Sequence, residues 1–104
     1  MKKNKIFTKE AKMNKYSQQI EAEIDLHQMT KDEAHKEVSD FLEESEVLGY
    51  KKIRIITGKG LHSESGVGVL NPYIREILDD YGYEYSSAKY NEGGEGAIDV
   101  FLRS

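Results

Sequence analysis

The sequence contains no cysteine among its 104 residues. This excludes disulfides, thiolate catalysis and zinc sites with cysteine ligands, and it makes the cytoplasm the default location. Long apolar runs are also missing, since no stretch approaches the roughly 20 apolar residues that span a bilayer. The lysines near the N-terminus are not followed by an apolar segment, so we expect neither secretion nor a membrane partner.

An excess of positive charge is absent as well. The formal net charge is −4, which argues against a general nucleic-acid coat but leaves room for a local basic patch. Six of the 15 lysines and arginines fall in the first 15 residues. Residues 1–19 are therefore expected to form a Lys-rich, flexible N-terminal arm, either a solvated tail or an arm that touches phosphate. Residues 20–104 form one domain in this interpretation.

The hydrophobic pattern predicts four strands and two helices in the order βαβαββ. Strands are expected at 23–27, 50–57, 83–88 and 97–102, and helices at 30–48 and 71–81. Strands joined through a helix should be parallel, whereas the last strand follows a short loop and should be antiparallel. Two helices cover only one face of such a sheet. The expected fold is an α/β chain of the α+β two-layer type, with a four-stranded mixed sheet and both helices on one face.

Local signals mark where these helices begin and end. Thr30 and Glu33 form a capping box, and Gly49 suits the C-terminal stop of the first helix. Asn71 followed by Pro72 is typical of the cap and first turn of the second helix, which should stop at Gly82. The first helix should bury one apolar stripe: Ala34, Val38, Phe41, Leu42 and Leu48.

The topology brings three segments to one rim of the sheet. The first strand ends at Asp25 and His27, and glycine-rich loops lie at 58–68, after the second strand, and at 91–96, before the last. In open α/β sheets this carboxyl end is where ligands bind. Glycines allow backbone N–H groups to approach an anion, and histidines donate hydrogen bonds or transfer protons near neutral pH. The rim therefore favours a phosphate ligand.

Each of these signals has a plainer interpretation when taken alone. Asp25 could pair with Arg54 or Lys52 on the open face of the sheet. The sequence Gly58-Lys59-Gly60 lacks the spacing of a nucleotide-binding loop and is more often a tight turn. A single exposed histidine such as His62 is usually an ordinary surface residue. The predicted meeting of the segments is what favours a functional site.

Three segments resemble motifs of the Smr (small MutS-related) domain family. Ile24-Asp25-Leu26-His27 is similar to its LDLHG signature, and residues 57–63 are similar to its (H/T)GxGxHS loop. Residues 93–100, which read GGEGAIDV, are similar to its closing GGxGAxxV motif. The resemblance covers about residues 22–102. One departure is Gln28, which stands where the family usually has glycine; a side chain there would crowd the substrate or strain a positive φ.

The resemblance implies a βαβαββ sandwich like the C-terminal domain of bacterial translation initiation factor three. It also implies an endonuclease that nicks or cleaves DNA or structured RNA, with Asp25 and His27 as catalytic residues. The implied phosphate-binding residues are Thr57, Gly58, Lys59, Gly60, His62, Ser63, Gly93, Gly94 and Gly96.

Any Mg²⁺ or Mn²⁺ would be loosely held, because few protein ligands are available. The alternative is a non-catalytic module that binds nucleic acid or a ribosome through the same rim. A weaker third alternative is a binder of small phosphorylated molecules.

Overall fold

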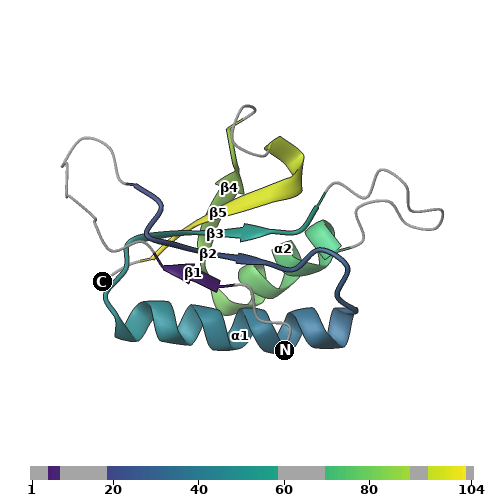
Figure 1. Cartoon of the computed structure of the whole chain (residues 1–104), viewed down its shortest axis with the longest axis horizontal. Coiled ribbons are helices and arrows are strands. Elements are labelled where there is room, and N and C mark those ends of the chain that lie inside the picture. The colour runs from purple at the N-terminus through teal and green to yellow at the C-terminus, as the bar shows by residue number, and fades with distance from the viewer. Residues whose placement is uncertain (1–4, 8–18, 59–69, 90–93, 103–104) are drawn as a thin grey trace.

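The computed structural model describes residues 5–7, 19–58, 70–89 and 94–102. Its sheet has the strand order β1-β2-β3-β5-β4, and the two helices lie on one face (Figure 1). Strands β2 (Ala22–Asp25) and β3 (Lys52–Ile56) are parallel, whereas β5 (Ala97–Phe101) is antiparallel to both β3 and β4 (Glu84–Ser87). The predicted two-layer α+β architecture and the antiparallel last strand are confirmed.

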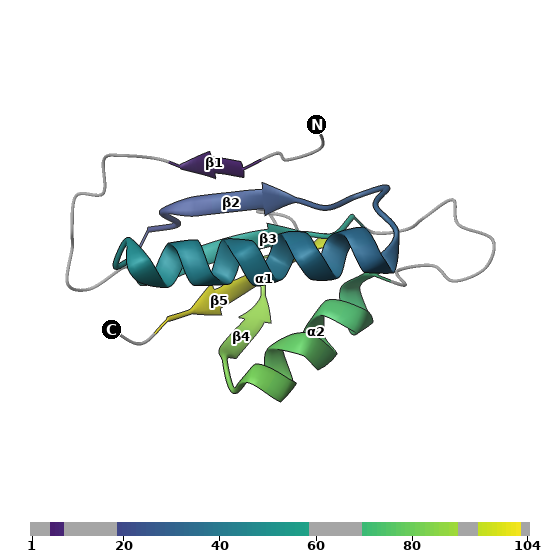
Figure 2. The ribbon, with the colours of Figure 1, turned by 90° about the horizontal axis from the view of Figure 1, so that it is seen from below.

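A short edge strand extends the four predicted ones. Strand β1 (Lys5–Phe7) pairs antiparallel with β2, with Lys5 opposite Ile24 and Phe7 opposite Ala22. Figure 2 shows it at the margin of the sheet next to β2. Sequence reasoning did not predict it because three residues carry no measurable alternation of polar and apolar side chains. The other residues of the first 18 lie outside the described part of the chain.

Helix α1 (Lys31–Val47) begins with the predicted capping box. The Thr30 hydroxyl accepts from the Glu33 N–H, and the Glu33 carboxylate accepts from the Thr30 N–H, both at 3.1 Å. The chain leaves the helix through Gly49, whose φ of 78° favours glycine. The prediction that Leu48 is buried is wrong, because the helix has already ended at Val47, and Leu48 is 57% exposed.

Helix α2 (Leu70–Tyr81) buries Ile74, Ile77 and Leu78 and is followed by Gly82 with φ 82°. The prediction of Asn71 as its N-cap is wrong, since Leu70 is already helical and the Asn71 side chain is used elsewhere. Within the described ranges, neither helix is long and apolar enough to cross a bilayer.

The core lies between the helices and one face of the sheet. Alternation along the strands places Ile24, Ile53, Ile55, Ile98 and Val100 against Phe41 and Leu78 of the helices. On the opposite face, Arg54 of β3 forms a two-pronged ion pair with Asp99 of β5, at 2.7 and 3.2 Å. Arg54 therefore pairs with Asp99, and the alternative that it pairs with Asp25 is not what the structure shows.

Candidate functional site

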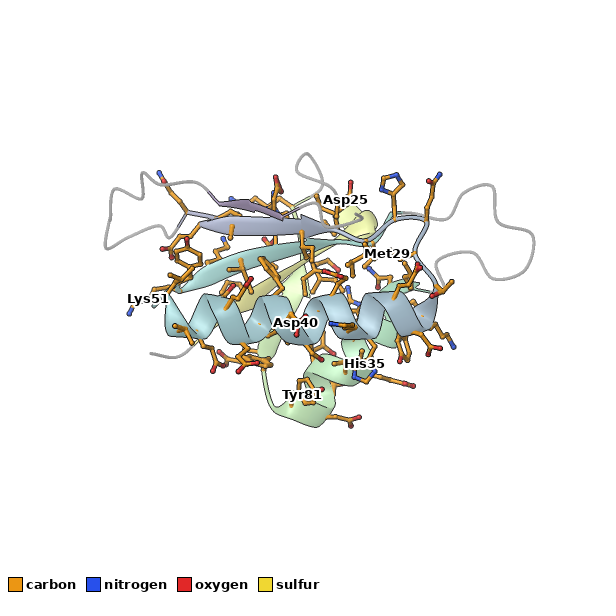
Figure 3. The ribbon with its side chains drawn as sticks, turned by 60° about the horizontal axis from the view of Figure 1, so that its bottom comes forward. Asp25, Met29, His35, Asp40, Lys51 and Tyr81 are labelled. Atoms are coloured by element: carbon orange, nitrogen blue, oxygen red, sulfur yellow. The ribbon has the colours of Figure 1, made fainter. Side chains whose placement is uncertain are left out.

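Asp25 and His27 form a hydrogen-bonded pair at the end of β2. One carboxylate oxygen of Asp25, Oδ1, lies 2.6 Å from His27 Nδ1 and 3.1 Å from the backbone N of His27. Alternation puts both side chains on the face away from the helices, and the side chains of His27 and Asp25 are 52% and 32% exposed. Figure 3 shows Asp25 on β2, apart from His35 on α1.

This geometry determines what the imidazole can do. A carboxylate only accepts hydrogen bonds, so Nδ1 carries the proton that bridges to Asp25. In the neutral ring, Nε2 is then the unprotonated nitrogen and is able to accept a proton from a reacting group. The backbone N–H of His27 holds the same carboxylate oxygen, which fixes the direction from which Asp25 meets the ring. The pair is suited to general acid–base chemistry.

The segment after β3 lies directly against this pair. A Cβ built on Gly58, whose φ is 82°, would come within 3.2 Å of the His27 Cβ. Leu26 N–H donates to the Ile56 carbonyl at 2.7 Å, which ties the ends of β2 and β3 together. His27 and Gly58, the first glycine of this loop, therefore lie close together, as the topology predicted.

The segment before β5 joins the same rim. The N–H groups of Thr57 and Gly58 both donate to the carbonyl of Gly96, at 2.9 and 3.0 Å. Gly96 closes the short 3-10 helix η2 (Gly94–Gly96), in which Gly94 has a φ of 52° and donates to the Lys89 carbonyl. Asp25, His27, Thr57, Gly58, Gly94 and Gly96 thus come from three segments that meet at one end of the sheet. Lys59, Gly60, His62, Ser63 and Gly93 lie outside the described residues.

Thr57 is held by a chain of polar contacts that sequence reasoning missed. It is 6% exposed, and its hydroxyl lies 3.2 and 3.3 Å from the carbonyls of Gly58 and Gly96. The same hydroxyl accepts from the Asn71 amide at 3.2 Å, Asn71 accepts from Arg75 at 2.7 Å, and Arg75 donates to Ser87 at 2.8 Å. The Asn71-Pro72 pair predicted a role for Asn71 as a helix cap and not as a partner of Thr57.

Gln28 follows His27 in the left-handed region, with φ 72°. A residue with a Cβ costs about 1–2 kcal/mol in this conformation relative to glycine. The sequence identified the position, and the structure shows that its backbone has the positive φ that glycine adopts without strain.

The described residues contain no group of three or more histidine, aspartate or glutamate side chains able to hold a metal ion. At the rim, Asp25 is the acidic side chain next to His27, and one of its oxygens is engaged by that histidine. A single carboxylate would hold a divalent cation only weakly, and solvent or substrate would have to supply most of the other ligands.

The comparisons with known proteins agree with this geometry. The Smr domain model matches residues 24–103. The chain belongs to the Smr domain family. This Smr domain is 37% identical over 92 residues to Endonuclease MutS2 of Finegoldia magna, covering 86% of this chain and 11% of that protein. It is 38% identical over 82 residues to the Smr domain-containing protein C11H11.03c of Schizosaccharomyces pombe, covering 79% of this chain and 38% of that protein.

Solved structures give the same result. The crystal structure of the Smr domain of Thermus thermophilus MutS2 matches with a TM-score of 0.70 and 37% identity, over 79% of this chain and 98% of that one. The crystal structure of YdaL, a stand-alone small MutS-related protein from Escherichia coli, matches with a TM-score of 0.71 and 27% identity, over 79% of this chain and 64% of that one. The chain spans about a tenth of the MutS2 protein that it matches, so the resemblance concerns the Smr domain.

Proposed function

We propose that this Smr domain is an endonuclease that hydrolyses phosphodiester bonds in DNA or structured RNA. The observation that carries the proposal is the 2.6 Å contact between Asp25 and His27 beside Gly58. Homology to the Smr domains of proteins named Endonuclease MutS2 supports the reaction class. The proposal does not distinguish DNA from RNA, because the described groups act on the phosphate that both share.

In this proposal His27 Nε2 accepts a proton from the water that attacks phosphorus. The bond from phosphorus to the leaving sugar oxygen breaks, and that oxygen takes up a proton from solvent water as it departs. Asp25 holds the ring by Nδ1 and stabilises the imidazolium that forms. Lys59, Gly60, His62, Ser63 and Gly93 are proposed to contact phosphate, since backbone N–H groups near glycines stabilise developing negative charge. The N–H groups of Thr57, Gly58 and Gly94 already donate to backbone carbonyls at the rim.

The proposed roles within that set differ with burial. The Thr57 hydroxyl is occupied by Asn71 and by neighbouring carbonyls, so it is better suited to fixing the loop than to touching substrate. Gly58 has no side chain where a Cβ would lie 3.2 Å from the His27 Cβ, so it lets the chain after β3 pass close to His27. A Mg²⁺ or Mn²⁺ ion, if used, would be held by Asp25 and would supply positive charge that stabilises the phosphate in the transition state.

The test is incubation of the chain with supercoiled plasmid and with structured RNA, in Mg²⁺, in Mn²⁺ and in EDTA. His27→Ala and Asp25→Asn should each lower the cleavage rate by about 10²–10⁴-fold, the usual contribution of a general acid–base group. His35→Ala and Glu23→Gln are matched controls, because one removes another exposed histidine and the other a neighbouring carboxylate on the same strand face. Cleavage by His27→Ala at the wild-type rate would refute the proposed role.

A non-catalytic module that binds nucleic acid or a ribosome is the second candidate. Gln28 favours it, because this exposed side chain directly follows His27 where the resemblance leads one to expect glycine. In that case a gel shift should appear without any product in either metal. Removal of residues 1–19 should then reduce the dependence of affinity on salt, since fewer phosphate charges would be neutralised.

A further inference from the structure

Two connections between elements carry the glycine-rich loops of the rim. The first, 57–69, joins β3 to α2, and the second, 88–96, joins β4 to β5. Described residues flank both connections: Thr57 and Asn71 at the ends of the first, and Ser87 and Gly96 at the ends of the second. These flanking residues belong to one series of hydrogen bonds, in which Arg75 joins the first connection to the second.

Local structure explains how the guanidinium of Arg75 reaches two elements. Asn71 and Arg75 are one turn apart on α2, so they share a face of the helix, and Arg75 Nε donates to the Asn71 side-chain oxygen at 2.7 Å. On β4, alternation places Tyr85 and Ser87 on one face of the strand. Arg75 Nη2 donates to the Ser87 hydroxyl at 2.8 Å, and Arg75 Cζ lies 5.4 Å from the centre of the Tyr85 ring. The planar guanidinium is therefore oriented by both α2 and β4.

The series continues from Asn71 to the end of the second connection. The Asn71 amide donates to the Thr57 hydroxyl at 3.2 Å, and this hydroxyl lies 3.3 Å from the Gly96 carbonyl. The same carbonyl accepts from the N–H groups of Thr57 and Gly58. The start of the first connection is thus bonded to the end of the second, and Arg75 bonds the end of the first to the start of the second.

We propose that Arg75 is a positioning residue that fixes the two connections relative to each other. Its consequence for catalysis rests on the proposed function, in which residues of both connections contact phosphate. Groups held in place before substrate binds do not have to be ordered in the transition state, so fixing them raises the rate. Arg75 acts through Asn71 and Ser87, and its fixed fork of donors is a geometry that the single ammonium group of lysine does not reproduce.

Amide hydrogen exchange of the ¹⁵N-labelled full chain tests this role without any assay of cleavage. The variant Arg75→Met keeps a long side chain beside Tyr85 and removes the guanidinium donors. The reporters are three N–H groups that donate to backbone carbonyls of Gly96 and Ala97: Thr57, Gly58 and Ala88. All three should exchange about tenfold faster or more, as expected when hydrogen bonds from a charged donor are lost.

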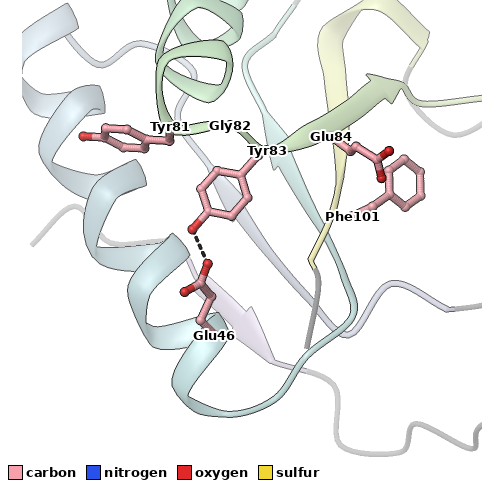
Figure 4. A pocket seen from close by; sticks show the side chains of 6 residues that line it. All are labelled: Glu46, Tyr81, Gly82, Tyr83, Glu84 and Phe101. Atoms are coloured by element: carbon pink, nitrogen blue, oxygen red, sulfur yellow. Dashed lines mark hydrogen bonds between the residues drawn. The ribbon is translucent and has the colours of Figure 1, made fainter.

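A reference amide separates this local effect from a loss of overall stability. The Tyr83 N–H donates to the Leu78 carbonyl at 2.9 Å, at the end of β4 away from the rim. Figure 4 shows this end of the domain, where the Tyr83 hydroxyl also donates to Glu46. An equal rise in exchange at Tyr83 would make Arg75 a purely structural residue, and a rise at Ala88 alone would mean that it does not join the two connections. Either result overturns the proposal, as does unchanged exchange.

Three further variants separate the geometry of Arg75 from its charge. Arg75→Lys keeps the charge and should still show the raised exchange, so wild-type exchange in this variant would contradict the role of the guanidinium fork. Lys36→Met is the matched control, because it removes a positive charge from an exposed ion pair with Asp40 on α1 and should leave the reporters unchanged. Ser87→Ala alters an exposed residue and keeps the test decisive if Arg75→Met does not fold. It should raise exchange at both connections by a smaller factor, and a rise confined to Ala88 would again overturn the link.

Cleavage kinetics then test the consequence for the reaction. In folded Arg75→Met, kcat should fall about 10–100-fold, the effect of misplaced reacting groups, while KM changes less. A wild-type chain that cleaves no nucleic acid would refute the proposed function and leave the exchange experiment to decide the role of Arg75. Raised exchange at both connections with unchanged kcat, in a wild type that cleaves, would overturn Arg75 as a positioning residue for the reaction.

Discussion

Gly58 and His27 lie so close together that a single added methyl group on Gly58 would be 3.2 Å from the His27 Cβ. Gly58 also has a φ of 82°, a conformation that side chains with a Cβ rarely adopt. Glycine at this position therefore allows both the backbone turn after β3 and the close approach to the His27 Cβ. The two requirements can be separated by experiment.

Gly58→Ala should destabilise the fold by about 1–2 kcal/mol because of the left-handed backbone. It should also displace His27 and reduce cleavage strongly. Gly82→Ala is the matched control, since Gly82 has the same φ of 82° and nothing within 4 Å of its added Cβ. Chemical denaturation and cleavage assays on both variants decide the point. If the two variants lose stability and activity alike, contact with His27 has no functional consequence.

Gln28→Gly should stabilise the domain by up to about 1 kcal/mol, because it relieves a left-handed φ of 72°. Part of this gain is offset by the greater freedom of glycine in the unfolded chain. Gln28→Ala keeps the strain and should leave the free energy of unfolding nearly unchanged. Urea denaturation of the three proteins measures the difference. A Gln28→Gly variant less stable than the wild type would show that the side chain makes contacts that outweigh the strain.

Asn71→Ala should cost about 1–2 kcal/mol, because it leaves the buried Thr57 hydroxyl without the Asn71 donor and the Nε of Arg75 without the Asn71 acceptor. The residues after β3 should then be less well fixed, and cleavage should fall further than stability alone explains. Ser87→Ala removes the hydrogen bond that Arg75 donates to the Ser87 hydroxyl. It should have a smaller effect on activity, since it leaves the Asn71–Thr57 bond intact. Activity retained in Asn71→Ala under conditions where it is folded would remove this network from the mechanism.

The ionisation of Tyr83 makes the free energy of unfolding depend on pH in the alkaline range. Burial, together with its hydrogen bond to Glu46, raises the pKa of Tyr83 well above its usual value of about 10. The neutral phenol is the form that the fold favours, so this contribution is complete below pH 10. It decreases as pH rises above 10, because the unfolded chain then loses the proton first. Tyr83→Phe should flatten the fall in stability between pH 10 and 12.

Absorbance titration of the seven tyrosines provides the direct measurement. In the wild type one phenol should ionise later than the others, and Tyr83→Phe should remove that late component. Tyr85, whose pKa is also raised, by its hydrogen bond to Asp79, is the comparison residue. If Tyr83→Phe leaves the latest ionisation in place, the hydrogen bond to Glu46 does not hold the phenol protonated.

Local patterns in the sequence determined the elements of this protein. The capping box at Thr30, the stops at Gly49 and Gly82 and the alternation around Ile24 act within a few residues, so each could be recognised without the fold. The order of the elements then placed Asp25 and His27 at the same rim as two glycine-rich loops. Three short motifs in these segments carry the resemblance to the Smr family.

Only the tertiary structure decided which polar side chains pair with one another. The sequence offered Asp25 three partners: Arg54, Lys52 and His27. Strand register sets Arg54 opposite Asp99 and Lys52 opposite Phe101, and Asp25 bonds to the histidine. Likewise, the Asn71 amide reaches Thr57 because packing brings α2 beside the end of β3. Short-range patterns report backbone preference, whereas the choice among possible partners for a polar side chain depends on distances between residues remote in sequence, which packing of the whole core establishes.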